Sequence, residues 1–206
     1  MILVGVVKTV SEEAIREAVR LGLADLGENR VQEAQGHIAA LGRGAVRWHL
    51  IGHLQRNKAG RAVELFDRVH GVDSVEVAEA LSRRAVAAGP RLLPVLVEVN
   101  VSGEATKFGV APEGVGELIE RVASLPGLAL DGLMTVGAPV GDAADARSGF
   151  ARLRALRDAG ERTLGRRLPE LSMGMSGDYE TAVEEGATLV RVGSALFGER
   201  SGPGRD

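Results

Sequence analysis

Short apolar runs alternate with longer amphipathic stretches along the whole chain. Eight of the apolar runs predict buried strands, over residues 2–7, 24–26, 48–51, 68–72, 93–101, 128–136, 170–173 and 188–192. Helical periodicity follows most of them, over residues 11–22, 29–41, onward from 55, 74–88, onward from 112, 143–164 and 179–185. Ser11 with Glu12 and Glu13 is typical of a helix start, because the hydroxyl can cap the helix and acidic residues favour its first turn.

Eight strand–helix units at a spacing of roughly 25 residues predict a (β/α)₈ TIM barrel. A doubly wound open sheet is the competing fold for alternating strands and helices. We favour the barrel because the number of units matches and no Rossmann glycine motif follows the first strand. No linker interrupts the pattern, so we expect a single domain over residues 1–200 and a flexible tail over 201–206.

Composition narrows the class of protein further. The 206 residues are 45% hydrophobic and 26% charged, and the net charge of −3 provides no basic excess for nucleic acid. No apolar run is long enough to span a membrane. We therefore expect neither nucleic acid nor a membrane as a partner. The absence of cysteine excludes disulfides and thiolate chemistry and favours the cytoplasm. With four histidines and no cysteine, no metal site is predicted.

Lysine is rare in this chain. Only Lys8, Lys58 and Lys107 are lysines among the 25 basic residues, and the rest are arginines. An amine can lose its proton and act as a nucleophile, whereas a guanidinium cannot in practice. Each lysine is therefore a candidate for amine chemistry, although a plain surface charge is the alternative in each case.

The active face of such a barrel lies at the carboxyl ends of its strands. The residues that close the predicted strands are Lys8, Glu28 with Asn29, Gly52 with His53, Asn100, Met134, residues 172–176, and Gly193 with Ser194. Lys8 follows six apolar residues directly. An amine at the end of a buried strand is partly desolvated, which disfavours its charged form and suits imine formation. The alternative is a lysine whose amine reaches out to solvent.

Phosphate sites in barrels lie in the loops after strands seven and eight, at the start of a short extra helix. Small residues occupy both positions here, in residues 174–178 and in Gly193, Ser194 and Ala195. Their backbone N–H groups can approach an anion, although ordinary turns would have the same composition. Arg191 alternates with apolar residues of the eighth strand, which predicts an inward side chain. A buried arginine needs a partner, either a carboxylate or the ring nitrogen of a cofactor.

Together these segments resemble one known family, the pyridoxal phosphate (PLP) homeostasis proteins, also called the YggS/PROSC family. The resemblance rests on seven segments in order: residues 4–9 (VGVVKT), 26–33 (LGENRVQE), 48–58 (WHLIGHLQRNK), 99–107, 132–134 (GLM), 171–176 (LSMGMS) and 190–198 (VRVGSALFG). The family's barrel is similar to the N-terminal barrel of alanine racemase. The expected fold is therefore a PLP fold type III-like barrel.

The resemblance implies a cofactor and a role for each site residue. Lys8 is expected to bind pyridoxal 5'-phosphate as an internal aldimine, and Arg191 to face the pyridine nitrogen. Ser176, Gly193 and Ser194 are expected to hold the phosphate. Asn29 and Met134 are expected to line the pocket. The sequence departs from the family in two places: it begins at the first strand without the usual preceding helix, and His53 stands where the family usually has proline.

The expected function is a monomeric, cytoplasmic carrier or regulator of PLP without turnover, with apo-enzymes as possible recipients. Lys107 is a hypothetical participant in that transfer. One alternative is a small PLP-dependent racemase, but such racemases take a second base from a tyrosine in a domain that this chain is too short to contain. Its only tyrosine is Tyr179. A Schiff-base aldolase acting on a phosphosugar and a scaffold barrel with an incidental phosphate site are the remaining alternatives.

Overall fold

The computed structural model is a closed barrel of eight parallel strands that pair in sequence order, with β8 pairing back to β1. The structure describes residues 1–104, 106–137 and 143–198. The barrel and its single domain confirm the predicted fold class and exclude an open sheet. The predicted tail at 201–206 lies outside the described residues.

The strands are short and mostly buried. They are β1 (Ile2–Val6), β2 (Asp25–Glu28), β3 (Arg47–Leu50), β4 (Arg68–Val72), β5 (Leu93–Glu98), β6 (Leu128–Met134), β7 (Glu170–Ser172) and β8 (Leu189–Val192). Their bounds differ from the predicted ones by up to three residues. The fifth strand shows the largest difference, because the chain leaves the sheet after Glu98, three residues before the predicted end.

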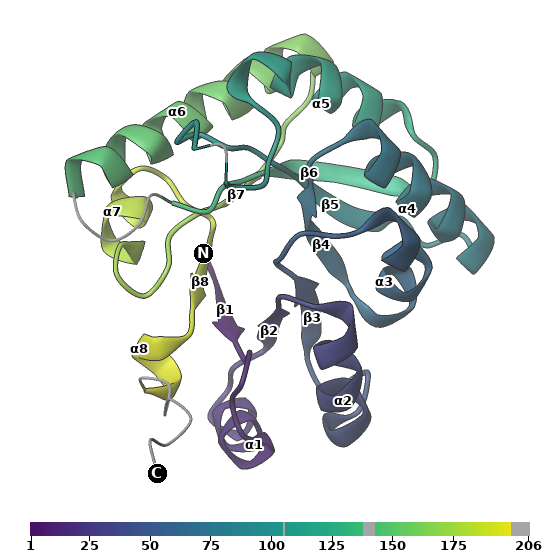
Figure 1. Cartoon of the computed structure of the whole chain (residues 1–206), viewed down its shortest axis with the longest axis vertical. Helices are drawn as coiled ribbons and strands as arrows, with labels where there is room; N and C mark the ends of the chain where they lie inside the picture. The colour runs from purple at the N-terminus through teal and green to yellow at the C-terminus, as the bar shows by residue number, and fades with distance from the viewer. Residues whose placement is uncertain (105, 138–142, 199–206) are drawn as a thin grey trace.

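Helices cover the outside of the barrel (Figure 1). They are α1 (Glu12–Arg20), α2 (Val31–Leu41), α3 (Ala59–Leu65), α4 (Val75–Ala88), α5 (Val115–Ser124), α6 (Ala143–Leu164), α7 (Tyr179–Glu184) and α8 (Ser194–Phe197). The 3₁₀ turns η1 (Arg56–Lys58) and η2 (Pro112–Gly114) precede α3 and α5. Ser11 caps α1 as predicted, since its hydroxyl accepts the backbone N–H of Ala14 at 3.3 Å. None of the described helices is both long and apolar enough to cross a bilayer.

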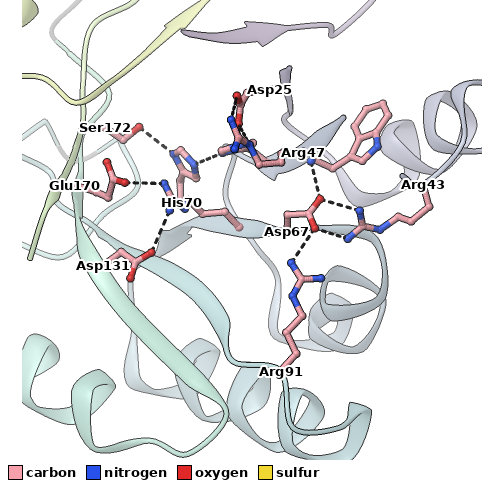
Figure 2. Close-up of polar contacts among 12 residues, drawn as sticks. Asp25, Arg43, Arg47, Asp67, His70, Arg91, Asp131, Glu170 and Ser172 are labelled. Atoms are coloured by element: carbon pink, nitrogen blue, oxygen red, sulfur yellow. Dashed lines mark hydrogen bonds and ion pairs between the residues drawn. The ribbon is translucent and has the colours of Figure 1, made fainter. Parts of the chain in front are cut away.

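The apolar core lies between strands and helices, where Trp48, Phe66 and Phe150 are fully buried. The amino-terminal part of the barrel carries ion pairs instead (Figure 2). Arg68, the first residue of β4, pairs with Asp131 at 3.1 Å and with Glu170 at 3.3 Å. These ion pairs link β4, β6 and β7 inside the amino-terminal part of the barrel. In barrels of this kind, ligands bind at the other end, where the strands have their carboxyl ends.

Candidate functional site

A cavity of about 1360 Å³ opens at the carboxyl-terminal ends of the strands. Six of the seven predicted site residues line it, namely Lys8, Asn29, Ser176, Arg191, Gly193 and Ser194. These residues come from four regions that are far apart in the sequence, after β1, β2 and β7 and at the end of β8. The parallel order of the barrel brings them to one end.

Lys8 lies two residues beyond β1 and is half-buried at the cavity wall. A strained turn presents it: Thr9 has a φ of 63°, the only positive φ outside glycine among the described residues. A β-branched residue rarely adopts this conformation, and such strain is found mostly at functional sites. The Thr9 hydroxyl donates to the Lys8 carbonyl at 2.6 Å. The Lys8 amine has no ion pair with a carboxylate among the described residues, so the amine is available to a ligand.

Backbone N–H groups converge on the hydroxyl of Ser176, which follows β7. The Ser176 hydroxyl oxygen accepts from the N–H of Gly193 at 3.2 Å and from that of Ala195 at 3.3 Å. The neighbouring Gly174 has a φ of 91°, and a Cβ there would lie 2.6 Å from that of Ala182. Glycine is therefore required for the turn after β7. The two N–H groups and the hydroxyl provide the donors that an oxyanion needs.

Arg191 points into the barrel as predicted and is 3% exposed. Its Nη1 donates to the Ser172 hydroxyl at 2.5 Å and its Nη2 to the Thr135 carbonyl at 2.7 Å. Its hydrogen-bonding partners are thus an alcohol and a carbonyl, rather than the carboxylate that was one of the two predicted possibilities. Burial lowers the pKa of Arg191 to about 10, although Glu98 and Asp178 raise it, so the guanidinium remains charged near neutral pH.

Glu98 is a further cavity residue that the sequence did not single out. It is the last residue of β5, is 4% exposed, and its Oε2 has no hydrogen-bond partner among the described residues. Burial and the nearby Asp73 raise its pKa to about 7, while Arg191 opposes the shift. A carboxyl group that is half protonated near neutral pH therefore faces the cavity.

Several predicted strand-end residues do not line the cavity, among them Met134, Glu28 and Asn100. Met134 is fully buried and is not among the lining residues, so its role stays a prediction. Glu28 turns to α2, where its Oε1 contacts His37 Nδ1 at 2.5 Å. The Asn100 amide instead holds the following loop, donating to the carbonyls of Glu104 and Lys107.

The rim of the cavity includes His53 and Phe108, whose rings stack with centroids 3.9 Å apart. His53 Nδ1 also lies 2.9 Å from Asp73 Oδ2. This contact gives His53 a defined place where the resembling family usually has proline. Lys107 precedes this rim and is held by Glu104 at 2.8 Å and by the Gly137 carbonyl at 3.0 Å.

The donors of this cavity fit one kind of ligand. An available amine suits an aldehyde, converging N–H groups suit a phosphate, and a buried guanidinium suits an acceptor such as a ring nitrogen. The fold and the site thus define a (β/α)₈ barrel that can hold an anionic aldehyde through a lysine.

The chain belongs to the family of pyridoxal phosphate homeostasis proteins, as comparison with known proteins shows. The family model "Alanine racemase, N-terminal domain" matches residues 3–201. The "Pyridoxal phosphate homeostasis protein" of Aquifex aeolicus (strain VF5) is 45% identical over 96% of this chain and 86% of its own length. That of Pseudomonas aeruginosa is 48% identical over 96% of this chain and 84% of its own length.

Solved structures agree with this placement. PipY of Synechococcus elongatus PCC7942, solved with PLP bound, has a TM-score of 0.86 and 40% identity, covering 95% of this chain and 92% of PipY. An alanine racemase of Clostridium difficile 630 has a TM-score of 0.77 at 19% identity, covering 98% of this chain and 53% of the racemase. The second likeness shows a shared fold alone.

Proposed function

We propose that this protein binds pyridoxal 5'-phosphate in the cavity at the carboxyl end of the barrel and carries or buffers it. The observation that carries the proposal is the meeting of the Lys8 amine, the N–H groups around Ser176 and the Arg191 guanidinium in one cavity. The family's name and the PLP-bound structure of PipY support it.

Each group has a specific task in this proposal. The Lys8 amine condenses with the aldehyde carbon and one water leaves, so the link is covalent but reversible. The N–H groups of Gly193 and Ala195, with the hydroxyls of Ser176 and Ser194, bind the phosphate. Asn29 lines the same cavity. Contact of Met134 with the ligand stays a prediction.

The donors around the ring favour holding the cofactor over turnover. Bound PLP supplies an electron sink for carbanion chemistry, and a protonated ring nitrogen strengthens that sink. Arg191 can only donate, so it leaves the ring nitrogen unprotonated. A racemase also needs a second base, and Tyr179, the chain's only tyrosine, is not among the residues that line the cavity.

A carrier must release its ligand to recipients. We propose that the protein acts as a cytoplasmic monomer that passes PLP to apo-enzymes, and that Lys107 at the rim assists this transfer. Transfer to an apo-enzyme should slow in Lys107→Ala while PLP uptake remains unchanged. Equal transfer rates in the variant and the wild type would exclude Lys107 from the step.

The decisive experiment is a PLP titration followed by visible absorbance and then by borohydride reduction and peptide mass mapping. The chain contains only three lysines, so the modified residue is assigned without ambiguity. We expect PLP on Lys8 and visible colour that is lost in Lys8→Ala. Lys58, which also lines the cavity, is the internal control.

Two outcomes would contradict the proposal. PLP attached mainly to Lys58 or Lys107 would refute the assignment of Lys8, and no uptake at all would refute PLP binding. Sustained racemization of any amino acid by the loaded protein would favour the racemase alternative over a carrier.

A further inference from the structure

A line of buried polar side chains crosses the barrel interior below the cavity. His49 Nε2 lies 2.9 Å from Asp25 Oδ1, and His49 Nδ1 lies 2.9 Å from His70 Nε2. His70 Nδ1 lies 2.9 Å from the Ser172 hydroxyl oxygen, which also accepts from Arg191 Nη1. All five residues are at most 4% exposed. Figure 2 shows His70 between Ser172 and the side of the barrel that carries Asp25.

The line runs from the bottom of the barrel to the cavity. Asp25 is the first residue of β2, while Ser172 is the last of β7 and Arg191 lies near the end of β8. Its lower end is closed by Arg47, whose side chain is 61% exposed and donates to Asp25 at 2.7 and 2.6 Å. The five side chains therefore connect a half-exposed ion pair at the bottom with the guanidinium at the cavity.

Both ends of the line have a fixed polarity. Arg191 can only donate hydrogen bonds. Asp25 only accepts when it is ionised, and its pKa is low: burial would raise it, but hydrogen bonds from His49 and Arg47 outweigh burial and lower the pKa to about 2. A donor at one end and an acceptor at the other specify the direction of every hydrogen bond between them.

This direction requires both imidazoles to be neutral with the proton on Nε2. Ser172 then donates to His70 Nδ1, His70 donates from Nε2 to His49 Nδ1, and His49 donates from Nε2 to Asp25. Burial, with the nearby charges of Arg191 and Arg68, lowers the pKa of His70 well below its ordinary value, which agrees with a neutral ring. In the opposite direction the Ser172 hydroxyl hydrogen would have no acceptor among the described residues, so only one arrangement uses every proton.

The end of the line fixes the position of Arg191. Hydrogen bonds to Ser172 and to the Thr135 carbonyl use one hydrogen from each Nη and hold the guanidinium plane. Three N–H groups of Arg191 remain for other partners. A side chain held by two neighbours cannot turn away from the cavity without breaking both bonds.

We propose that Asp25, His49, His70 and Ser172 are positioning residues, a one-directional hydrogen-bond chain that holds Arg191 toward the ring nitrogen of the bound cofactor. This proposal rests on the proposed function, because PLP is the ligand toward which Arg191 is held. The hydrogen-bond chain itself is a property of the protein without any ligand. It adds four residues to the site, none of which lines the cavity. Three of them, Asp25, His49 and His70, were not among the predicted strand-end residues.

The chain can be tested first without PLP. In a His37→Gln, His53→Gln double variant labelled with ¹⁵N-histidine, only His49 and His70 contribute ring signals. We expect both rings to be neutral at pH 7 and protonated on Nε2 alone. A proton on Nδ1 of either ring, or a doubly protonated ring, would overturn the proposal because the chain would not run in one direction.

The second test compares PLP binding in Ser172→Ala, Ser172→Thr and Ser82→Ala. Ser82 is the matched control, since it is equally buried and donates to the Pro126 carbonyl outside the cavity. We expect Ser172→Ala to weaken PLP binding about tenfold, because a hydrogen bond to a charged group is lost. It should also shift the visible absorption maximum of the lysine-bound cofactor. Ser172→Thr, which keeps the hydroxyl, should restore both properties, and Ser82→Ala should change neither.

The outcomes separate this proposal from the function on which it rests. If Ser172→Ala binds PLP with wild-type affinity and colour, Arg191 does not depend on the chain and the proposal is wrong. If the wild type takes up no PLP, the proposed function fails, and the ¹⁵N experiment still decides whether the chain exists.

Discussion

Glu98 and Arg191 are buried side chains of opposite charge that line the same cavity, and each shifts the pKa of the other toward its charged form. Burial nevertheless dominates for Glu98 and raises its pKa from 4.5 to about 7. The folded protein therefore binds this proton more tightly than the unfolded chain does. The stability that Glu98 contributes is fully present below pH 4.5 and is lost as the pH rises through 7.

Glu98→Gln should remove this pH dependence. Gln stays neutral, so we expect the variant to be more stable than the wild type above pH 7, by on the order of 2 to 3 kcal/mol. Below pH 4.5 the two should differ little. Urea unfolding across this pH range measures the difference. A constant difference at every pH would show that Glu98 does not titrate in this range.

Ser176→Ala should weaken the binding of PLP more than that of pyridoxal, which lacks the phosphate. The Ser176 hydroxyl is hydrogen-bonded to the N–H groups of Gly193 and Ala195, the proposed phosphate donors. Loss of the hydroxyl should therefore affect binding of the phosphate rather than of the pyridine ring. We expect roughly a tenfold loss for PLP and little change for pyridoxal. Ser124→Ala is the control, because Ser124 is the last residue of α5 and does not line the cavity. Equal losses for both ligands would place the phosphate elsewhere.

Asp67→Asn should destabilise the protein at neutral pH. Burial would raise the pKa of Asp67, but hydrogen bonds from Arg43, Arg91 and the Trp48 N–H outweigh it and lower the pKa (Figure 2). We expect a loss of about 1 to 3 kcal/mol above pH 4, which fades as the pH falls through the lowered pKa. Denaturant unfolding at two pH values measures it.

The matched control for this cluster is Arg91→Gln, whose side chain is 67% exposed. An exposed ion pair contributes less than about 1 kcal/mol, so this variant should stay close to the wild type. A larger loss in Arg91→Gln than in Asp67→Asn would contradict the view that the buried carboxylate is the central member.

Gly132→Ala should be among the most damaging substitutions in the barrel. A Cβ at Gly132 would lie 1.8 Å from the Glu170 carbonyl oxygen, a backbone atom of the adjacent strand. Strands β6 and β7 would have to separate, so we expect a loss above about 3 kcal/mol or failure to fold. The measurement is thermal unfolding followed by circular dichroism.

Gly116→Ala makes the same glycine-to-alanine change, but here we expect the stability of the protein to rise rather than fall. Gly116 lies within α5 with nothing within 4 Å of an added Cβ. Alanine is the better helix former, so this variant should gain about 0.5 to 1 kcal/mol. Similar effects at the two glycines would show that strand separation is not the cause.

The sequence was sufficient to predict the barrel and the main ligand-binding groups of the cavity, since six of the seven predicted site residues line it. Strand ends carry the ligand groups in such a fold, and Lys8, Ser176 and Arg191 were recognisable by their position after or within apolar runs. The site roles themselves stay predictions until ligand binding is measured.

The buried hydrogen-bond chain could not be predicted from the sequence in the same way. His70 and Asp25 lie inside short strands, and nothing local distinguishes them from residues that turn outward. A one-residue shift in the pairing register reverses the side on which every residue of a strand faces, and the sequence alone does not give the register. The predicted second strand also omitted Glu28 and included Ala24. Contacts such as His70 with Ser172, 102 residues apart, depend on the closed order of strands.

The pairing of β1 with β8 has a consequence for how any partner protein could bind this barrel. Every strand of the described barrel has two hydrogen-bonded neighbours, so the sheet offers no free rim of N–H and C=O groups to which a foreign strand could add. A partner protein would therefore have to contact the loops and side chains around the open end of the cavity. A substitution in those segments would therefore alter the binding of a partner while leaving the hydrogen bonds of the closed sheet intact.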